Sequence, residues 1–359
     1  MSNNTKVTTP PAPQQGTVPA PLSQQHALLQ IKDTRVWYTT ITGEARVVDG
    51  VDVTINKNEV FGLAGESGCG KSTLVEGVLR LIKSPGHIKS GHVLFTYPKS
   101  VNGEDTTVDL FTMGLNEVRP LRWQHIAYVP QGAMNSLNPV MRIEDQIADA
   151  ILEHSKTTKA KAMANVRQRL DMVGLPASVA HMYPHELSGG MKQRVTIASA
   201  ITLRPELLIA DEPTTALDVN VQKVILQELL DIRKQLNLTI VYVSHDMAVH
   251  AELADRMGIM YAGVMMEVGT TIQIFKDPLH PYTQGLIHSI PDIGKERKRV
   301  EGIPGLAPSP LAWPNGCRFH PRCPHVKDIC KRVEPPLLEA RPGRLVACHI
   351  YSELWDKAS

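Results

Sequence analysis

The chain has little cysteine and few aromatic residues, with five Cys and 5% Phe, Trp and Tyr in 359 residues. It contains no apolar run that approaches the ~18 residues of a membrane-spanning helix, and its N-terminus lacks the basic patch and apolar core of a signal peptide. The formal net charge is only +2, so nucleic acid is not expected as the main partner. Together these absences predict a cytosolic protein whose thiols stay reduced.

The chain divides into three regions by composition. Residues 1–27 are rich in Pro, Gln and Thr and poor in large apolar residues, which predicts a disordered tail. Residues 28–275 have the pattern of a globular domain. In residues 276–359 prolines become dense, and we expect a separate, loop-rich extension, with "KERKR" at 295–299 as a solvated linker.

The central region alternates short β-rich runs with longer amphipathic segments. Buried strands are predicted at 59–65, 207–212 and 239–246, and helices at 71–82 and 220–236. Strand–helix–strand alternation of this kind predicts the α/β class, with a mainly parallel sheet covered on both faces.

The segment "GESGCGKST" (65–73) has the pattern of a phosphate-binding loop, between a predicted strand and a predicted helix. Its glycines, Gly65, Gly68 and Gly70, let the backbone curl so that N–H groups point at phosphates, and Lys71 neutralises their charge. The Ser72 hydroxyl can ligate Mg²⁺. The other predicted nucleotide-binding positions are Glu66, Ser67, Cys69 and Thr73; for Cys69 we favour a small filler without a redox role.

Two acidic residues follow the predicted strand in "LLIADEP" (207–213). The carboxyl end of a strand is where ligands lie in open α/β sheets. Asp211 is a candidate Mg²⁺ ligand, and Glu212 is a candidate general base for an attacking water. Two acids after a strand can also cap a helix, but the upstream phosphate loop favours catalysis.

In "ELSGGMKQR" (186–194), Ser188 is predicted to cap a helix that begins near Gly190. The pattern LSGG-x-x-Q, ~20 residues before the acidic strand, resembles the signature of the ATP-binding-cassette (ABC) ATPases. The resemblance implies a nucleotide-binding domain with a parallel-sheet core, an antiparallel β-subdomain and a helical subdomain at about 132–200. It also implies that Ser188, Gly189, Gly190 and Gln193 of one subunit complete the ATP site of another.

The resemblance assigns further positions. It implies that Gln131 reads Mg²⁺ and the γ-phosphate, that Asp218 contacts the partner subunit, and that His245 holds the γ-phosphate and the attacking water. Tyr38 aligns best with the aromatic residue that stacks on adenine, with Trp37 as its competitor.

The segments "QGAMNSLNPVMRIEDQI" (131–147), "ADEPTTALDVNVQ" (210–222) and "PLHPYTQGLIHSIP" (278–291) resemble the ATPase subunits of dipeptide and oligopeptide importers. This branch implies two transmembrane permease subunits, an extracytoplasmic substrate-binding protein, a second related ATPase, and a peripheral place on the cytoplasmic face of the inner membrane. Oligosaccharide or nickel cargo, and a soluble ABC ATPase outside transport, remain alternatives. In "QGAMNS" the chain departs from the Asp-Pro-containing version of many relatives, which affects the expected coupling surface.

Four of the five cysteines lie in the extension with the spacing C-x5-C-x6-C-x17-C: Cys317, Cys323, Cys330 and Cys348. Nearby Arg and His side chains, at positions 318, 320, 322 and 325, are expected to lower the thiol pKa values and favour a soft metal centre. Structural zinc usually uses a closer Cys pair. Spacing alone leaves iron–sulfur, zinc and no metal open, whereas the resemblance implies a four-iron four-sulfur cluster.

Overall fold

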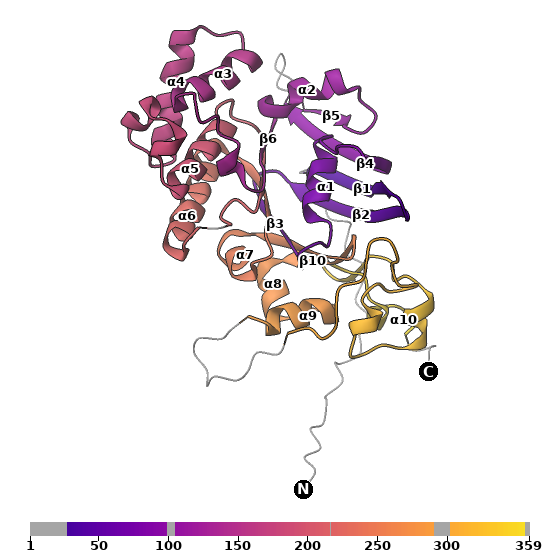
Figure 1. The fold of residues 1–359 in the computed structure, drawn as a ribbon. Coiled ribbons are helices and arrows are strands. Elements are labelled where there is room, and N and C mark those ends of the chain that lie inside the picture. The colour runs from indigo at the N-terminus through magenta and orange to yellow at the C-terminus, as the bar shows by residue number, and fades with distance from the viewer. Residues whose placement is uncertain (1–26, 99–104, 216, 291–301, 356–359) are drawn as a thin grey trace.

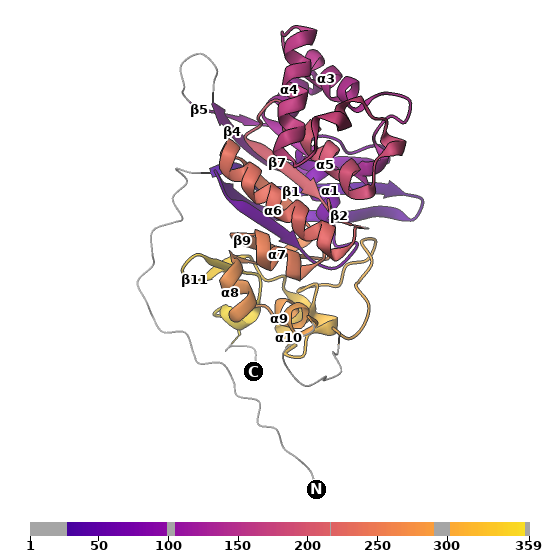
Figure 2. The same ribbon diagram turned by 90° about the vertical axis from the view of Figure 1, so that its left-hand side faces the viewer.

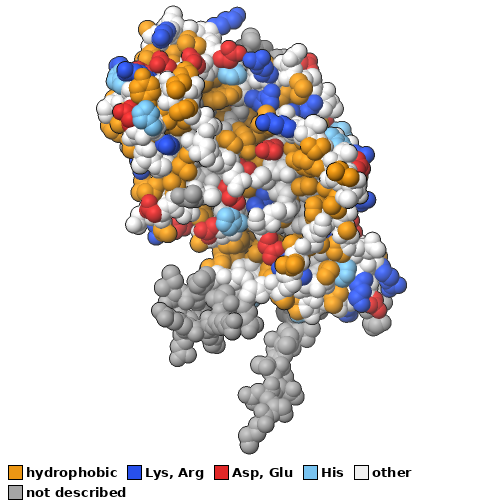
Figure 3. Space-filling view, viewed as in Figure 1, with side chains coloured by type: hydrophobic (Ala, Val, Ile, Leu, Met, Phe, Trp, Pro, Cys, Tyr) orange, Lys and Arg blue, Asp and Glu red, His pale blue; other side chains and the backbone are white. Residues whose placement is uncertain are grey.

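The computed structural model describes residues 27–98, 105–215, 217–290 and 302–355 (Figure 1). The predicted tail, apart from Ala27, and the predicted linker at 295–299 lie outside these residues. None of the helices within the described ranges combines the length and the apolar character that a membrane crossing requires. Hydrophobic, acidic and basic side chains are interspersed on the face shown in the space-filling view (Figure 3).

The main sheet has eight strands in the order β11-β12-β10-β9-β3-β8-β7-β6. Its centre is parallel, from β9 to β6, and the three strands on the other side of β9 are antiparallel. Strands β3, β7 and β8 are buried along their whole length, as strands covered on both faces should be. The strand bounds are β3 (Val60–Ala64), β6 (Ile126–Val129), β7 (Leu207–Asp211), β8 (Thr239–Val243), β9 (Arg256–Tyr261), β10 (Val264–Thr270), β11 (Leu338–Arg341) and β12 (Arg344–Val346).

A second, four-stranded antiparallel sheet has the order β2-β1-β4-β5. Its strands are β1 (Ala27–Thr40), β2 (Gly43–Asn56), β4 (Gly86–Pro98) and β5 (Asp105–Asp109). Helix α1 (Lys71–Val78) packs between the two sheets, because its buried side chains Leu74, Val75 and Val78 join one core with residues of both. The helix ends four residues earlier than the predicted 71–82.

Helices cover the other face of the main sheet and form a separate layer at one end (Figures 1 and 2). They are α3 (Ile143–His154), α4 (Lys159–Met172), α5 (Gly189–Ala200) and α6 (Val219–Leu236). Helix α2 (Leu115–Gln124) instead lies near β5 and contacts β6, and its buried Leu121 joins the core between the two sheets. Helices α3, α4 and α5 fall within the range 132–200 that was expected for a helical subdomain. The predicted helix 220–236 is confirmed as α6. It begins at Val219, directly after Asp218, whose carboxylate caps the helix by accepting the N–H groups of Asn220 and Val221.

Helices α7 (Met247–Leu253) and α8 (Thr271–Lys276) end the central region. The C-terminal region that follows contains α9 (Pro281–His288), α10 (Asp328–Arg332) and the hairpin β11–β12. It is loop-rich, as predicted. It is not a separate appendage, however, because β12 pairs with β10 and continues the main sheet. Its buried Phe319 also belongs to the same core as Met257 and Tyr261 of β9.

Candidate active site

The phosphate loop joins β3 to α1, the strand–loop–helix context that its sequence predicts. Gly65, Gly68 and Gly70 all have φ in the left-handed region, at 151°, 79° and 105°. A side chain at Gly65 would also collide with the protein, since a Cβ there would lie 2.1 Å from the carbonyl oxygen of Met260. The loop is therefore pressed against the end of β9, and only glycine fits this position.

Lys71 is the first residue of α1 and is almost fully buried. Its ammonium group donates to the carbonyl oxygens of Gly65 and Glu66, at 2.8 and 3.0 Å. The lysine side chain thus folds back onto its own loop. A bound phosphate group would replace these carbonyl oxygens as the acceptor of the ammonium hydrogen bonds. Cys69 is buried in the same loop, and burial raises the pKa of its thiol, in keeping with the expected filler role.

Asp211 ends β7 and is 1% exposed. Burial is the main reason that the pKa of its carboxyl rises to about 6, and a hydrogen bond from Ser72 opposes that rise. One carboxylate oxygen, Oδ1, has no hydrogen-bond partner among the described residues. A buried, unpartnered carboxylate oxygen beside the Ser72 hydroxyl is a suitable donor set for Mg²⁺.

Asp211→Asn is expected to stabilise the nucleotide-free protein at pH 7.5. Because the folded state raises the carboxyl pKa, ionising Asp211 above pH 6 costs the fold about 2–3 kcal/mol, which Asn avoids. The gain should shrink as the pH falls through 6 and vanish near pH 4. Thermal unfolding without nucleotide, measured across this range, checks it; a gain that does not depend on pH would contradict the explanation.

Glu212 follows directly in the chain, and its backbone adopts the left-handed region, with φ of 46°. Its carboxylate accepts hydrogen bonds from Gln131 Nε2 (3.1 Å) and Thr215 Oγ1 (3.1 Å) and contacts His245 Nδ1 (2.8 Å). Partial burial alone would raise the pKa of Glu212, but the hydrogen bonds of His245 and Thr215 lower it below its ordinary value. The carboxylate is therefore ionised and able to accept a proton.

Three predicted residues thus meet at the carboxyl ends of neighbouring strands. Gln131 follows β6, Glu212 follows β7 and His245 follows β8, which are adjacent in the sheet. Sequence reasoning missed Thr215 as the fourth member of this cluster, although it precedes the predicted Asp218 by only three residues. The predicted contact of Gln131 with Mg²⁺ stays a prediction; in the structure its amide contacts Glu212.

The signature segment lies in a different part of the molecule. Ser188 caps α5, accepting the N–H of Met191 at 3.3 Å, as predicted. A Cβ at Gly190 would lie 2.6 Å from Val221 Cγ1, so this glycine lets α5 begin close against α6. Helix α5 packs against α3, α4 and α6, whereas the phosphate loop precedes α1 beside the antiparallel sheet (Figure 1). Gln193 is buried.

Trp37 and Tyr38 are neighbours on β1, so their side chains point to opposite faces of the sheet. The Trp37 indole donates to Asp49 at 3.3 Å, and Arg46 and Lys89 lie over its ring. Tyr38 packs partly buried against the core that includes α1. The Trp37 ring is already in contact with Asp49, Arg46 and Lys89. This is compatible with Tyr38, and not Trp37, as the adenine-stacking residue, but that assignment stays a prediction.

The four C-terminal cysteines line one small pocket, although they span residues 317–348. Apolar side chains, among them Phe319 and Trp355, form much of its wall. A backbone hydrogen bond from Cys317 to Cys330 (2.8 Å) closes the loop between them. Among the described residues, no group of three or more His, Cys, Asp or Glu side chains is arranged to hold a metal ion.

The expectation that nearby cations lower the thiol pKa values is wrong. Burial raises the pKa of Cys317 to about 12 and also raises those of Cys323 and Cys348. The two arginines of this segment point elsewhere: Arg318 pairs with Asp49 and Arg322 pairs with Glu66. Burial therefore favours the neutral thiol at Cys317, Cys323 and Cys348.

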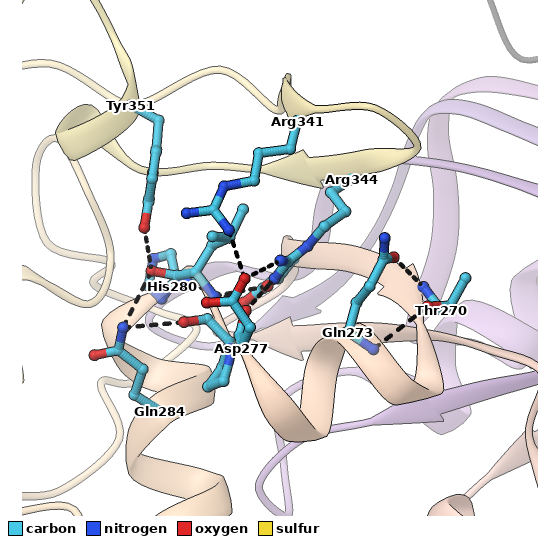
Figure 4. Close-up of polar contacts among 11 residues, drawn as sticks. Thr270, Gln273, Asp277, His280, Gln284, Arg341, Arg344 and Tyr351 are labelled. Carbon is cyan, nitrogen blue, oxygen red and sulfur yellow. Dashed lines mark hydrogen bonds and ion pairs between the residues drawn. The ribbon is translucent and has the colours of Figure 1, made fainter. Parts of the chain in front are cut away.

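A buried ion pair joins the C-terminal hairpin to strand β10 of the main sheet (Figure 4). Glu267 of β10 is fully buried and accepts the N–H groups of Leu279 and His280, both at 2.9 Å. Arg344 of β12 donates to Glu267 at 3.0 Å and also to Asp277 at 2.9 Å. Nearby, Tyr351 donates to the Leu279 carbonyl. Leu279 and His280 of this junction belong to the segment 278–291, which resembles the peptide-importer branch.

Comparisons with known proteins agree with this geometry. The family model described as ABC transporter matches residues 48–215, and that described as oligopeptide/dipeptide transporter, C-terminal region, matches residues 266–330. The chain is 42% identical to the dipeptide transport ATP-binding protein DppD of Caldanaerobacter subterraneus, over 91% of this chain and 98% of that protein. It is 40% identical to the oligopeptide transport ATP-binding protein OppD of Escherichia coli, over 92% and 96% of the two chains.

Among solved structures, the chain resembles the ATP-binding cassette MJ0796 in a dimeric post-hydrolysis state with ADP and Pi. The TM-score is 0.58 at 23% identity, covering 68% of this chain and 98% of that one, which shows the shared fold. With relatives at about 40% identity along almost their whole length, the chain belongs to the family of ATP-binding subunits of ABC transporters, in the branch with the oligopeptide/dipeptide transporter C-terminal region.

Proposed function

We propose that this protein is the ATP-hydrolysing subunit that powers import of dipeptides or oligopeptides across the cytoplasmic membrane. The observation that carries the proposal is the cluster of Gln131, Glu212 and His245 at one sheet edge, on the same domain as a phosphate loop with its lysine. The peptide cargo rests on relatives that are named as dipeptide and oligopeptide transport proteins.

Each residue of the site has a proposed task. The loop amides and Lys71 bind the phosphates of ATP, Ser72 and Asp211 hold Mg²⁺, and Glu212 accepts the proton of the attacking water. When bound, Mg²⁺ neutralises charge on the transferred phosphoryl group. His245 keeps Glu212 ionised in the resting site and is available to the γ-phosphate once that contact opens.

The signature segment 186–194 is proposed to complete the site of a partner subunit. Its distance from the chain's own phosphate loop supports this, since α5 lies in the helical layer and α1 beside the antiparallel sheet. The proposed partners are a second, related ATPase, two transmembrane permeases and an extracytoplasmic substrate-binding protein. The protein would then be peripheral, on the cytoplasmic face of the membrane.

Reconstitution of the subunit with its permeases and binding protein in vesicles tests the proposal. We expect dipeptides or longer peptides to stimulate ATP hydrolysis, and oligosaccharides or Ni²⁺ to have no effect. Stimulation by a sugar or a metal would keep the ATPase role and overturn the cargo. Co-purification with ribosomes or DNA in place of membrane subunits would overturn the transport role itself.

We also propose that Cys317, Cys323, Cys330 and Cys348 hold a four-iron four-sulfur cluster. The support is the donor set: four cysteines line one pocket, and four thiolates are the usual ligands of such a cluster. Two features oppose a preformed metal site. Burial raises the pKa values of Cys317, Cys323 and Cys348, and no group in the described part of the chain is arranged for a metal ion. Binding would require the thiols to lose their protons and the pocket to widen. The bound cluster would cross-link the extension.

Anaerobic purification is the decisive measurement for the cluster. We expect about four irons and four sulfides per chain and absorbance near ~400 nm. Cys323→Ser should remove most of this signal, whereas Cys69→Ser, a buried cysteine outside the pocket, should retain it. A colourless, iron-free anaerobic preparation would overturn the proposal, and one zinc per chain would replace it.

A further inference from the structure

We propose that Arg322 and Tyr282, both in the C-terminal region, are positioning residues for the phosphate loop and thereby set the affinity for ATP. The proposal rests on the phosphate-binding role assigned above to residues 65–73. It concerns the contacts that the C-terminal region makes with Glu66, the second residue of that loop.

Glu66 is held at both its side chain and its backbone. Arg322 forms a two-pronged ion pair with its carboxylate, at 2.7 Å from Nη1 to Oε2 and 2.9 Å from Nη2 to Oε1. The Glu66 N–H donates to the Tyr282 hydroxyl at 2.9 Å. The carbonyl oxygens of Gly65 and Glu66 are the groups that accept Lys71. The placement of Glu66 therefore determines where the phosphate-binding lysine rests.

Arg322 is itself held rigidly. It is 8% exposed, and besides its two bonds to Glu66 it makes three further hydrogen bonds. It donates to the carbonyls of Pro304 (2.8 Å) and Ile303 (3.2 Å) and to the Tyr261 hydroxyl (3.3 Å). The hydrogen bond to Glu66 is the main cause of a raised Arg322 pKa. A fork of fixed donors of this kind cannot be reproduced by lysine.

Tyr282 is equally fixed. It is fully buried and packs against the rings of Tyr261 and Phe319, with centroids 4.6 and 5.4 Å away. Phe319 lies between Arg318 and Arg322 in the sequence and is also buried. The hydroxyl that receives the Glu66 N–H is thus placed by the same aromatic cluster over which Arg322 lies.

A second arginine of the same segment holds the other end of the loop. Arg318 donates to the carbonyl of Ala262 (2.6 Å) and to Asp49 (2.7 Å). The next residue, Gly263, donates its N–H to the carbonyl of Cys69 at 3.0 Å. Residues 317–323 therefore form a wall of the cysteine pocket and, through Arg318 and Arg322, brace the phosphate loop near both ends.

The expected result is a change in ATP binding with little change in the chemical step. Arg322→Gln leaves Glu66 without its charged partner, and loss of a charge-assisted pair is worth about tenfold in an equilibrium constant. We expect the Kd for ATP and the KM to rise roughly 5- to 20-fold, with kcat at saturating ATP within about twofold. Amide hydrogen exchange of residues 65–73 should become faster.

The full-length chain supplies its own controls. Arg341→Gln removes an exposed arginine of the same region, which pairs with Asp277 and not with the loop, and should change neither ATP affinity nor exchange. Arg322→Lys should restore only part of the affinity. Adding Glu66→Gln to Arg322→Gln should cause little further loss, because the two side chains act through each other.

Tyr282→Phe keeps the aromatic ring and removes only the hydroxyl that accepts the Glu66 N–H. It therefore tests the positioning of the phosphate loop even if Arg322→Gln fails to fold. A native protein with unchanged ATP affinity and unchanged loop exchange in either variant would overturn the proposal, as would fully additive effects of Arg322→Gln and Glu66→Gln. Lys71→Ala distinguishes failure of this proposal from failure of the phosphate-binding role of residues 65–73. If Lys71→Ala retained ATP binding, the role of the loop would be refuted, independently of the result for Arg322.

Discussion

Glu212→Gln should reduce ATP turnover by roughly 10²- to 10⁴-fold, the usual contribution of a general base, while ATP binding survives. The amide cannot accept the proton of the attacking water, yet it keeps the size of the side chain and can still contact Gln131 and Thr215. Steady-state phosphate release and equilibrium nucleotide binding, measured on the same preparation, check the two halves of this expectation.

A matched control lies at the other end of the same strand. Glu206 precedes β7 and also pairs with a histidine, His125, at 2.8 Å. Glu206→Gln makes the same chemical change at the edge away from the nucleotide site and should leave turnover within about twofold. If Glu212→Gln retained turnover at the level of Glu206→Gln, the assignment of the base would be wrong.

Arg344→Ala should lower the free energy of unfolding by about 3–5 kcal/mol, because it leaves the fully buried carboxylate of Glu267 without its cation. Among the described residues, the backbone N–H groups of Leu279 and His280 would be its only remaining hydrogen-bond donors. The loss should be visible in urea or thermal unfolding of the full chain.

Arg341 is the matched comparison, since it lies on the same hairpin and contacts the same Asp277 (Figure 4). It is exposed, so Arg341→Ala should cost less than about 1 kcal/mol. Equal effects of the two substitutions would show that burial of Glu267 does not govern the stability of this junction.

The sequence predicts the centre of the molecule well because its signals are local. Apolar runs and glycine spacing predict β3, β7, β8 and the phosphate loop, and helical periodicity predicts α6 to within one residue at its start. Contacts between side chains that are far apart in the chain produce no local sequence pattern of this kind. The pair of Arg322 with Glu66 joins residues 256 positions apart, and nothing in either segment indicates the other.

The cysteine segment also shows that local sequence does not predict tertiary contacts. Its composition suggests cations next to thiols, and adjacency in sequence suggests that they interact. In the fold, Arg318 and Arg322 turn toward Asp49 and Glu66, so burial decides the thiol pKa values instead. The direction in which a side chain points is set by tertiary packing, which the order of residues does not reveal.

The pairing of β12 with β10 has a consequence for how much of the chain the fold needs. Without the hairpin, β10 would be the last strand of the sheet, with a row of unpaired N–H and C=O groups along buried residues such as Val268. Such a bare edge invites pairing with another molecule. The hairpin therefore covers this edge of the sheet. We expect a chain shortened before residue 277 to aggregate more readily and to lack the cysteine pocket.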